Sequence, residues 1–112
     1  LYENLSMLEN GPKVLAEGKK LSEGGSFKVS GSKGLLLLEV ASSSARSRKM
    51  EVFIKGINAE RNIHISYADG TSLNITITVT WSGSNATIKC TRFWAEGQWS
   101  GGKSQIYYAY TI

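Results

Sequence analysis

The longest regular pattern in the sequence is an alternation of apolar and polar side chains over residues 73–81, which read Leu-Asn-Ile-Thr-Ile-Thr-Val-Thr-Trp. Successive side chains of a β-strand leave opposite faces of a sheet, so this run predicts a long strand with one apolar and one hydrophilic face. β-Branched residues dominate the run, and they suit a pleated, half-buried surface. The rest of the chain must cover the apolar face and pair with the edges of this strand.

Other short runs of strand character lie on both sides of this one. Asp69-Gly70 and Ser82-Gly83 have the composition of hairpin turns and flank the 73–81 run. Leu35–Val40 is nearly continuous in its hydrophobicity, which is typical of an interior strand. The remaining expected strands are 13–17, 26–30, 50–57, 63–67, 86–94 and 106–112. About eight short strands at this spacing, without an amphipathic helix, predict an all-β fold: an antiparallel, jelly-roll-like β-sandwich.

The 112 residues are enough for one domain with a core of its own. Asn10-Gly11-Pro12 is a cluster of residues that interrupt regular structure. We therefore expect residues 1–12 to be a linker or entry segment and residues 13–112 to form a single β-sandwich domain. Because the chain begins with Leu1 and not with Met, we expect it to be a module of a longer protein. The most apolar run, Leu35–Leu38, is far shorter than the roughly 18 residues of a membrane span, so no membrane insertion is expected.

Cysteine and histidine each occur once, as Cys90 and His64. A single cysteine excludes an internal disulfide and a cysteine-based zinc site, and its place in an alternating run favours a small buried core residue. A chain without disulfides fits synthesis in a reducing cytoplasm. His64 has no partners at metal-ligand spacing, so we expect it to face solvent, and we expect neither a metal nor another cofactor.

The formal net charge of +4 is compatible with an acidic partner. The small basic loop around Arg46, Arg48 and Lys49 is narrower than the stripe with interleaved aromatics that nucleic-acid binding usually needs, so no nucleic-acid partner is expected. The sequence contains no Gly-x-Ser-x-Gly motif and no Gly-x-Gly-x-x-Gly motif. The scattered carboxylates form no recognisable catalytic pair, and we do not predict an enzyme.

Aromatic residues are concentrated near the C-terminus, around a glycine-rich loop. Trp94 and Trp99 bracket Glu96 and Gln98. Aromatic rings stack on the apolar faces of sugars, while carboxylates and amides bond to the sugar hydroxyls. We therefore predict a saccharide site formed by Trp94, Glu96, Gln98 and Trp99, with Trp99 the most exposed. For Trp94, a position in the core is an equally supported alternative.

Phe53 and Tyr107 are expected on outer strand faces, where a monomer would carry polar groups. Apolar side chains in such positions indicate a subunit interface. This prediction depends on which alternate residues of the strands at 50–57 and 106–112 are assigned to the core. The residues assigned to the core are Met50, Val52, Ile54, Ile106, Tyr108, Tyr110 and Ile112.

Several of these segments together resemble the C-terminal β-sandwich domains of tail fibre and minor structural proteins of bacteriophages and prophages. The resemblance is carried by Val14–Gly18, Gly24–Ser30, Leu35–Val40 and Ile106–Tyr108. It implies a receptor-binding or adhesion module, often homotrimeric, that recognises a cell-surface glycan at a virion or other extracellular surface. The alternative is a structural module that forms a homotrimeric interface and has no ligand of its own.

Overall fold

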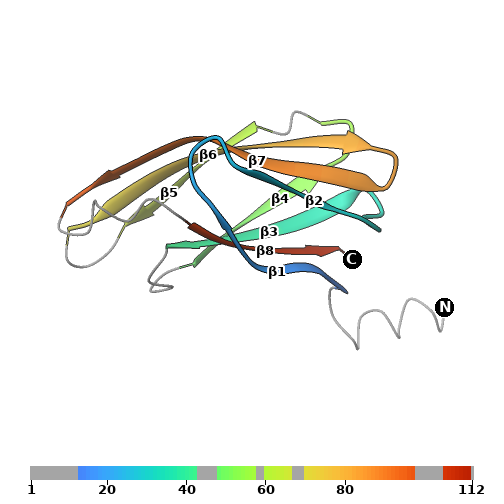
Figure 1. Ribbon diagram of the computed structural model, residues 1–112, viewed down its shortest axis with the longest axis horizontal. Helices are drawn as coiled ribbons and strands as arrows, with labels where there is room; N and C mark the ends of the chain where they lie inside the picture. Colours follow the sequence, from blue (N-terminus) through green and yellow to red (C-terminus); the bar gives the residue numbers. More distant parts are fainter. Residues whose placement is uncertain (1–12, 43–47, 58–59, 67–69, 98–104, 112) are drawn as a thin grey trace.

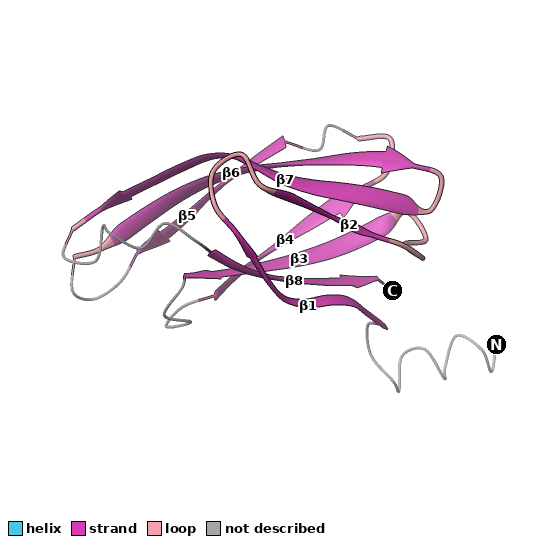
Figure 2. Cartoon of the chain, viewed as in Figure 1, coloured by secondary structure: helices cyan, strands magenta, loops and turns pink. Residues whose placement is uncertain are grey.

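The computed structural model describes residues 13–42, 48–57, 60–66, 70–97 and 105–111. These residues form two four-stranded sheets that pack face to face (Figure 1), and every regular element among them is a strand (Figure 2). The strands are β1 (Lys13–Leu21), β2 (Ser26–Val29), β3 (Leu35–Ser42), β4 (Arg48–Ile54), β5 (Glu60–Ser66), β6 (Ser72–Ser82), β7 (Asn85–Glu96) and β8 (Gln105–Thr111). The predicted all-β sandwich is confirmed.

The strand order is β1-β8-β3-β4 in one sheet, here called sheet A, and β2-β7-β6-β5 in the other, sheet B. All neighbouring strands are antiparallel. The first strand pairs with the last and the second with the seventh, a nested arrangement that suits a jelly-roll-like sandwich. The predicted linker at residues 1–12 lies outside the described residues.

Strand β6 contains the 73–81 run and lies inside sheet B, between β7 and β5. Its hairpin with β7 closes where Ser82 pairs with Asn85. Gly83 occupies the first of the two turn positions with a φ of 60°, a left-handed conformation that glycine adopts without steric cost. Strand β3, expected to be interior, lies between β8 and β4 in sheet A. The predicted long strand over residues 73–81 and the predicted interior position of the Leu35–Val40 strand are therefore confirmed.

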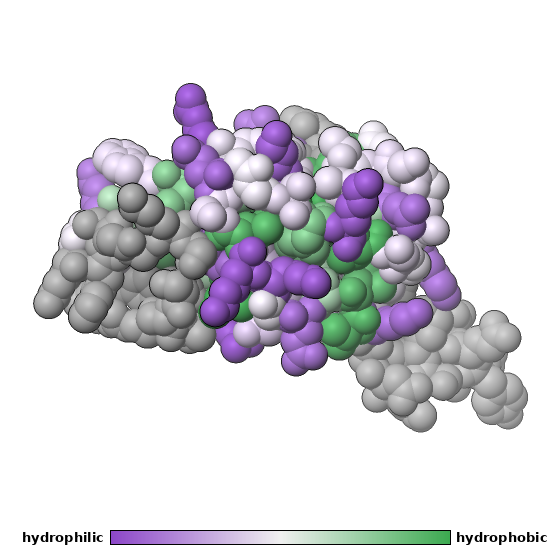
Figure 3. All heavy atoms as spheres, in the orientation of Figure 1, coloured by the Kyte–Doolittle hydropathy of each residue, from purple (hydrophilic) through white to green (hydrophobic). Residues whose placement is uncertain are grey.

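The hydrophobic core fills the space between the two sheets. Sheet B contributes the apolar face of β6, as its alternation predicts, together with Ile88 and Cys90 of β7. Sheet A contributes alternate residues of β3, and the predicted burial of Cys90 is confirmed by its 0% exposure. Figure 3 shows the molecule from the side, with hydrophobic residues along the middle, between the two layers, and hydrophilic residues on either side of them.

The predicted interface residues Phe53 and Tyr107 are in the core, so their assignment to outer faces is wrong. Both are 0% exposed, and the Phe27 ring lies 6.1 Å from the Tyr107 ring between the sheets. In both β4 and β8, the side chains expected to face inward face outward, and those expected to face outward face inward. Because the side-chain period is two, this reversal moves the described residues predicted to be inward to the outer face: Met50, Val52, Ile54, Ile106, Tyr108 and Tyr110. Ile112, predicted to be inward as well, lies outside the described residues.

Strand β3 determines this phase, because it pairs with both β4 and β8. Leu36 is buried and pairs with Phe53, while Val40 is buried and pairs with Tyr107. Directly paired residues share a face of the sheet, so both aromatic rings must point inward. The Tyr107 hydroxyl finds a partner there, since it donates to the side-chain oxygen of the buried Gln105 at 2.8 Å.

Candidate functional site

The outer face of sheet B is hydrophilic because the polar residues of β6 project from it. Asn74, Thr76 and Thr78 alternate with the buried residues of this strand. On β5, Asn62 and His64 pair directly with Thr76 and Asn74, so amides, hydroxyls and an imidazole form one continuous polar surface. His64 is exposed, which confirms the expectation that it faces solvent.

A β-bulge in β7 decides which of its side chains join this surface. Ile77 of β6 pairs with Cys90, but the next residue toward the N-terminus, Thr76, pairs with Arg92. Thr91 is therefore an extra residue in β7, and it shifts the alternation of the residues that follow. Cys90 and Phe93 both contact the core as a result, while Arg92 and Trp94 both project outward.

Trp94 is the exposed aromatic that this bulge presents, with 61% of its surface accessible. It pairs with Asn74 on β6, so the indole ring borders the polar surface. The ring adjoins an open pocket of about 480 Å³, whose lining residues are Glu23, Asn62, Asn74, Thr76, Arg92, Phe93 and Trp94. The pocket thus combines the exposed Trp94 ring and the half-buried Phe93 with amides, a hydroxyl, a guanidinium and a carboxylate.

Hydrogen bonds between neighbouring strands hold the polar floor of the pocket in place. The Asn62 amide nitrogen donates to the Thr76 hydroxyl at 3.1 Å, and the Asn74 side-chain oxygen lies 3.1 Å from Nδ1 of His64. An amide oxygen can only accept, so the imidazole must donate from Nδ1. Nε2 of His64 lies 2.8 Å from the Ser66 hydroxyl, which fixes the ring at both nitrogens.

Glu23 forms one wall of the pocket from the connection between β1 and β2. One oxygen of its carboxylate accepts a hydrogen bond from the backbone N–H of Phe93 at 3.0 Å. The bond ties the β1–β2 connection to β7 beside Trp94. Glu23 is the one carboxylate that lines the pocket among the described residues, whereas glycosidases need two carboxylates across one sugar. The arrangement is suited to holding a polyol.

Of the four predicted ligand-binding residues, the structure describes Trp94 and Glu96. Both are exposed on β7, so the core alternative for Trp94 is excluded. Glu96 pairs with Ser72 and does not line the pocket. Gln98 and Trp99 lie outside the described residues. The sequence prediction missed Asn62, Asn74 and Thr76, although the polar alternation of β6 was a signal that its outer face is rich in hydrogen-bonding groups.

The described residues give little support to a metal site, a reactive thiol or a membrane-spanning helix. No group of three or more His, Cys, Asp or Glu residues there has the arrangement of a metal site. Burial raises the pKa of the Cys90 thiol, which keeps it protonated and poorly nucleophilic. The described residues include no helix long and apolar enough to cross a membrane.

Comparison with known proteins identifies no relative. No protein-family model matches the chain, and no curated protein or solved structure matches it significantly. The resemblance to phage tail domains thus stays a prediction, and the function has to be inferred from the site itself.

Proposed function

We propose that this domain is a saccharide-binding module of the receptor-binding or adhesion type, in which the outer face of sheet B holds a sugar against Trp94. The observation that carries the proposal is the 61% exposure of Trp94 beside a pocket lined by amide and hydroxyl groups. A large aromatic side chain left in water on a regular strand forgoes most of the stabilisation that its burial would give. A ligand that covers the ring restores that stabilisation.

A sugar satisfies both halves of this pocket at once. Its C–H face covers the indole ring, and its hydroxyls exchange hydrogen bonds with neighbouring polar groups. The floor is prepared for this role, because Asn62, His64 and Asn74 are already held by bonds between strands. Ordering these side chains before the ligand arrives lowers the entropic cost of binding.

The resemblance to phage tail domains supports a cell-surface glycan as the ligand and a tail fibre or surface protein as the parent. In that setting the domain would be displayed on a virion or another extracellular surface. The pocket is consistent with such a role because it is open to solvent, where a polymer can enter from the side. A binding module needs no further catalytic group.

Replacing Trp94 with alanine is expected to weaken saccharide binding by about thirtyfold or more, since a buried tryptophan at the centre of an interface is commonly worth about 2 kcal/mol or more. A glycan array would identify a ligand for the unmodified domain, and titration calorimetry would give the two affinities. Thr80→Ala serves as the control, because Thr80 lies on the exposed end of β6 and does not line the pocket. A folded domain that binds no glycan, or a Trp94→Ala variant of unchanged affinity, would contradict the proposal.

A second candidate function, assembly into a homotrimer, is favoured by the outer face of sheet A. Aliphatic side chains are exposed there in positions where an isolated sandwich carries polar groups. The cross-strand pairing places further apolar residues beside them on the same face. The exposed members of this apolar face are Val14, Met50, Val52 and Ile54, and the half-buried members are Leu35, Leu37, Tyr108 and Tyr110.

The charges on the apolar face suit contact with further copies of the same chain. Arg48 forms an ion pair with Glu39 at 3.0 Å, and its guanidinium carbon lies 4.8 Å from the centre of the Tyr108 ring. The two charges compensate each other, so this pair adds no net charge to the apolar face.

Placing a charge in the apolar face is expected to dissociate such an oligomer. We expect Val52→Lys to shift the mass in solution from an oligomer to a monomer, because burying an unpaired ammonium is costly. Sedimentation equilibrium measures this directly, with Thr80→Lys on the opposite side of the sandwich as the control. A monomeric unmodified domain at high concentration would exclude the assembly function.

A further inference from the structure

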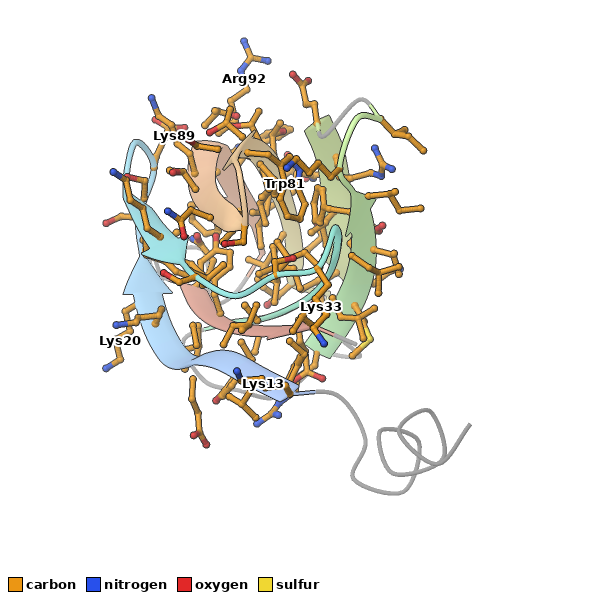
Figure 4. The ribbon with its side chains drawn as sticks, turned by 90° about the vertical axis from the view of Figure 1, so that its right-hand side faces the viewer. Lys13, Lys20, Lys33, Trp81, Lys89 and Arg92 are labelled. Atoms are coloured by element: carbon orange, nitrogen blue, oxygen red, sulfur yellow. The ribbon has the colours of Figure 1, made fainter. Side chains whose placement is uncertain are left out.

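Three cations follow one another on the β2–β7 side of the outer face of sheet B. Arg92 and Lys89 belong to β7, and Lys28 belongs to the neighbouring strand β2. All three side chains are exposed. Figure 4, which looks along the long axis of the molecule, shows Lys89 and Arg92 projecting away from the sandwich on the side of sheet B, while Trp81 points into the interior.

The pairing of β2 with β7 sets the spacing of these cations. Ser26 pairs with Lys89 and Thr87 pairs with Lys28, so the two lysines are diagonal neighbours, with backbones about 7–8 Å apart. Arg92 and Trp94 are two residues apart on the same face of β7, which separates them by about 7 Å. A chain that leaves the Trp94 ring along β7 therefore passes Arg92 first and then Lys89 and Lys28.

The charges of these cations are not compensated by their described neighbours. None of the three forms an ion pair with a described carboxylate. The carboxylates of this face are Glu23, which lines the same pocket as Arg92, Glu96 at the end of β7, and Glu60 on β5. The last is separated from Lys89 by Thr78, across two strand spacings of about 5 Å each. The positive charge farthest from Glu23 and Glu96 thus lies at the end of the row formed by Lys89 and Lys28.

We propose that the saccharide held on sheet B is an extended anionic polysaccharide, and that Arg92, Lys89 and Lys28 select its charged groups. The inference rests on the proposed saccharide site at Trp94. One sugar lies on the indole ring, and acidic groups of the following sugars lie against the row of cations. The polar floor on β5 and β6 meets the uncharged hydroxyls on the other side of the polymer.

An anionic polysaccharide fits this face better than a nucleic acid does. Single-stranded nucleic acids are held by several aromatic rings on which successive bases stack. On the described part of this face, Trp94 is the one exposed side chain among Phe, Tyr and Trp residues. The remaining groups are hydroxyls and amides, which match the many hydroxyls of a sugar polymer. Sulfate and carboxylate groups would both be attracted by the same cations, and experiment must distinguish them.

Dextran and its charged derivatives provide a matched set of probes, because sulfate or carboxymethyl groups are added to the same neutral backbone. We expect the domain to bind dextran sulfate or carboxymethyl dextran about tenfold more tightly than dextran at low salt, with the difference shrinking as added salt screens exposed charges. The derivative that binds more tightly identifies the preferred anion. Binding is measured by biolayer interferometry on the purified domain at several salt concentrations.

Replacing one cation outside the pocket by a neutral residue tests the preference for charged polysaccharides separately from the binding of the sugar itself. Lys89→Gln is expected to lower affinity for the charged dextrans about threefold or more and to leave dextran binding unchanged. Lys20→Gln is the matched control, since it removes the same charge from β1 in sheet A, well away from Lys89 (Figure 4). Equal melting temperatures would show that both variants remain folded.

The outcomes distinguish this inference from the proposed function. Equal affinity for neutral and charged dextrans, failure to bind the charged polymers, or equal effects of Lys89→Gln and Lys20→Gln would overturn the anionic selectivity alone. Dextran sulfate binding that survives Trp94→Ala unchanged would overturn the saccharide site itself. Tighter binding of a thymidine oligonucleotide than of either charged dextran, with the same dependence on Lys89, would assign the face to nucleic acid and overturn the inference.

Discussion

Replacing Phe53 with alanine is expected to destabilise the domain by about 3–5 kcal/mol, the usual cost of removing a buried phenyl ring and leaving a cavity. Phe53 is 0% exposed and pairs with the buried Leu36. The guanidinium carbon of Arg61 lies 5.5 Å from the centre of its ring, so the substitution also removes a contact between β4 and β5. Because small domains are stable by only about 5–15 kcal/mol, this loss is a large part of the total.

Urea unfolding followed by circular dichroism measures the effect, with Val52→Ala as the control. Val52 is the next residue along β4 but is 41% exposed on the outer face. Its truncation is expected to change the free energy of unfolding by less than about 1 kcal/mol. The opposite ranking of the two variants would show that β4 has the phase first inferred from its sequence, with Phe53 outside.

Alkaline pH is expected to destabilise the domain steeply, because Tyr107 must stay neutral in the core. Burial raises the pKa of Tyr107 far above its usual value near 10, and the Cys90 thiol beside it, whose own pKa is also raised by burial, adds to this shift. The unfolded chain releases the tyrosine proton near pH 10, whereas the folded chain retains it. The unfolded state then binds fewer protons, so the free energy of unfolding falls by about 1.4 kcal/mol for each pH unit above that point.

Cys90 acts in the same direction from a lower pH, since a thiol in the unfolded chain ionises before a tyrosine does. The free energy of unfolding is therefore fully retained at neutral pH and declines as the pH rises through the ordinary pKa values of these two groups. Comparing unmodified protein with Tyr107→Phe between pH 7 and 11 isolates the tyrosine contribution. Tyr110, whose pKa is also raised by burial, is common to both proteins, so its effect cancels.

Above pH 10, the free energy of unfolding of Tyr107→Phe is expected to fall less steeply with pH than that of the unmodified protein. The difference in slope is the contribution of one proton. At neutral pH the variant loses the 2.8 Å hydrogen bond to Gln105, at a cost of about 1–2 kcal/mol. The two stability curves should therefore converge as the pH rises. Parallel curves would mean that Tyr107 ionises within the folded protein and is not buried.

Strict alternation made the sandwich predictable. In β6 one face is entirely apolar and the other entirely polar, so both the strand and its orientation follow from sequence alone. In β4 and β8 both faces carry apolar side chains, and the period of two then allows either phase. Pairing with β3 decides between them, and that pairing is a property of the whole sheet, which no local pattern contains.

The site was partly predictable for a related reason. Trp94 and Glu96 were predicted as site residues from their residue types. The orientation of Trp94, however, depends on the extra residue Thr91, which is defined only by the pairing of β7 with β6. The other pocket residues come from β5, β6 and the β1–β2 connection. Asn62 and Thr76 are far apart in sequence and become neighbours only through the sheet. Sequence composition thus led to the prediction of a saccharide ligand, which stays a prediction, while the position of the pocket required the fold.

The hydrophilic and apolar outer faces lie on opposite sides of the sandwich, and their opposition constrains how an assembly could use them. Copies joined through sheet A would turn their sheet B faces away from one another. Sites directed in different ways cannot all engage one polymer lying on a flat surface, so the gain in avidity from a single glycan layer would be limited. Each site could instead hold a polymer on a different particle. An assembly of this geometry would agglutinate glycan-coated particles in suspension more readily than it would grip a single surface.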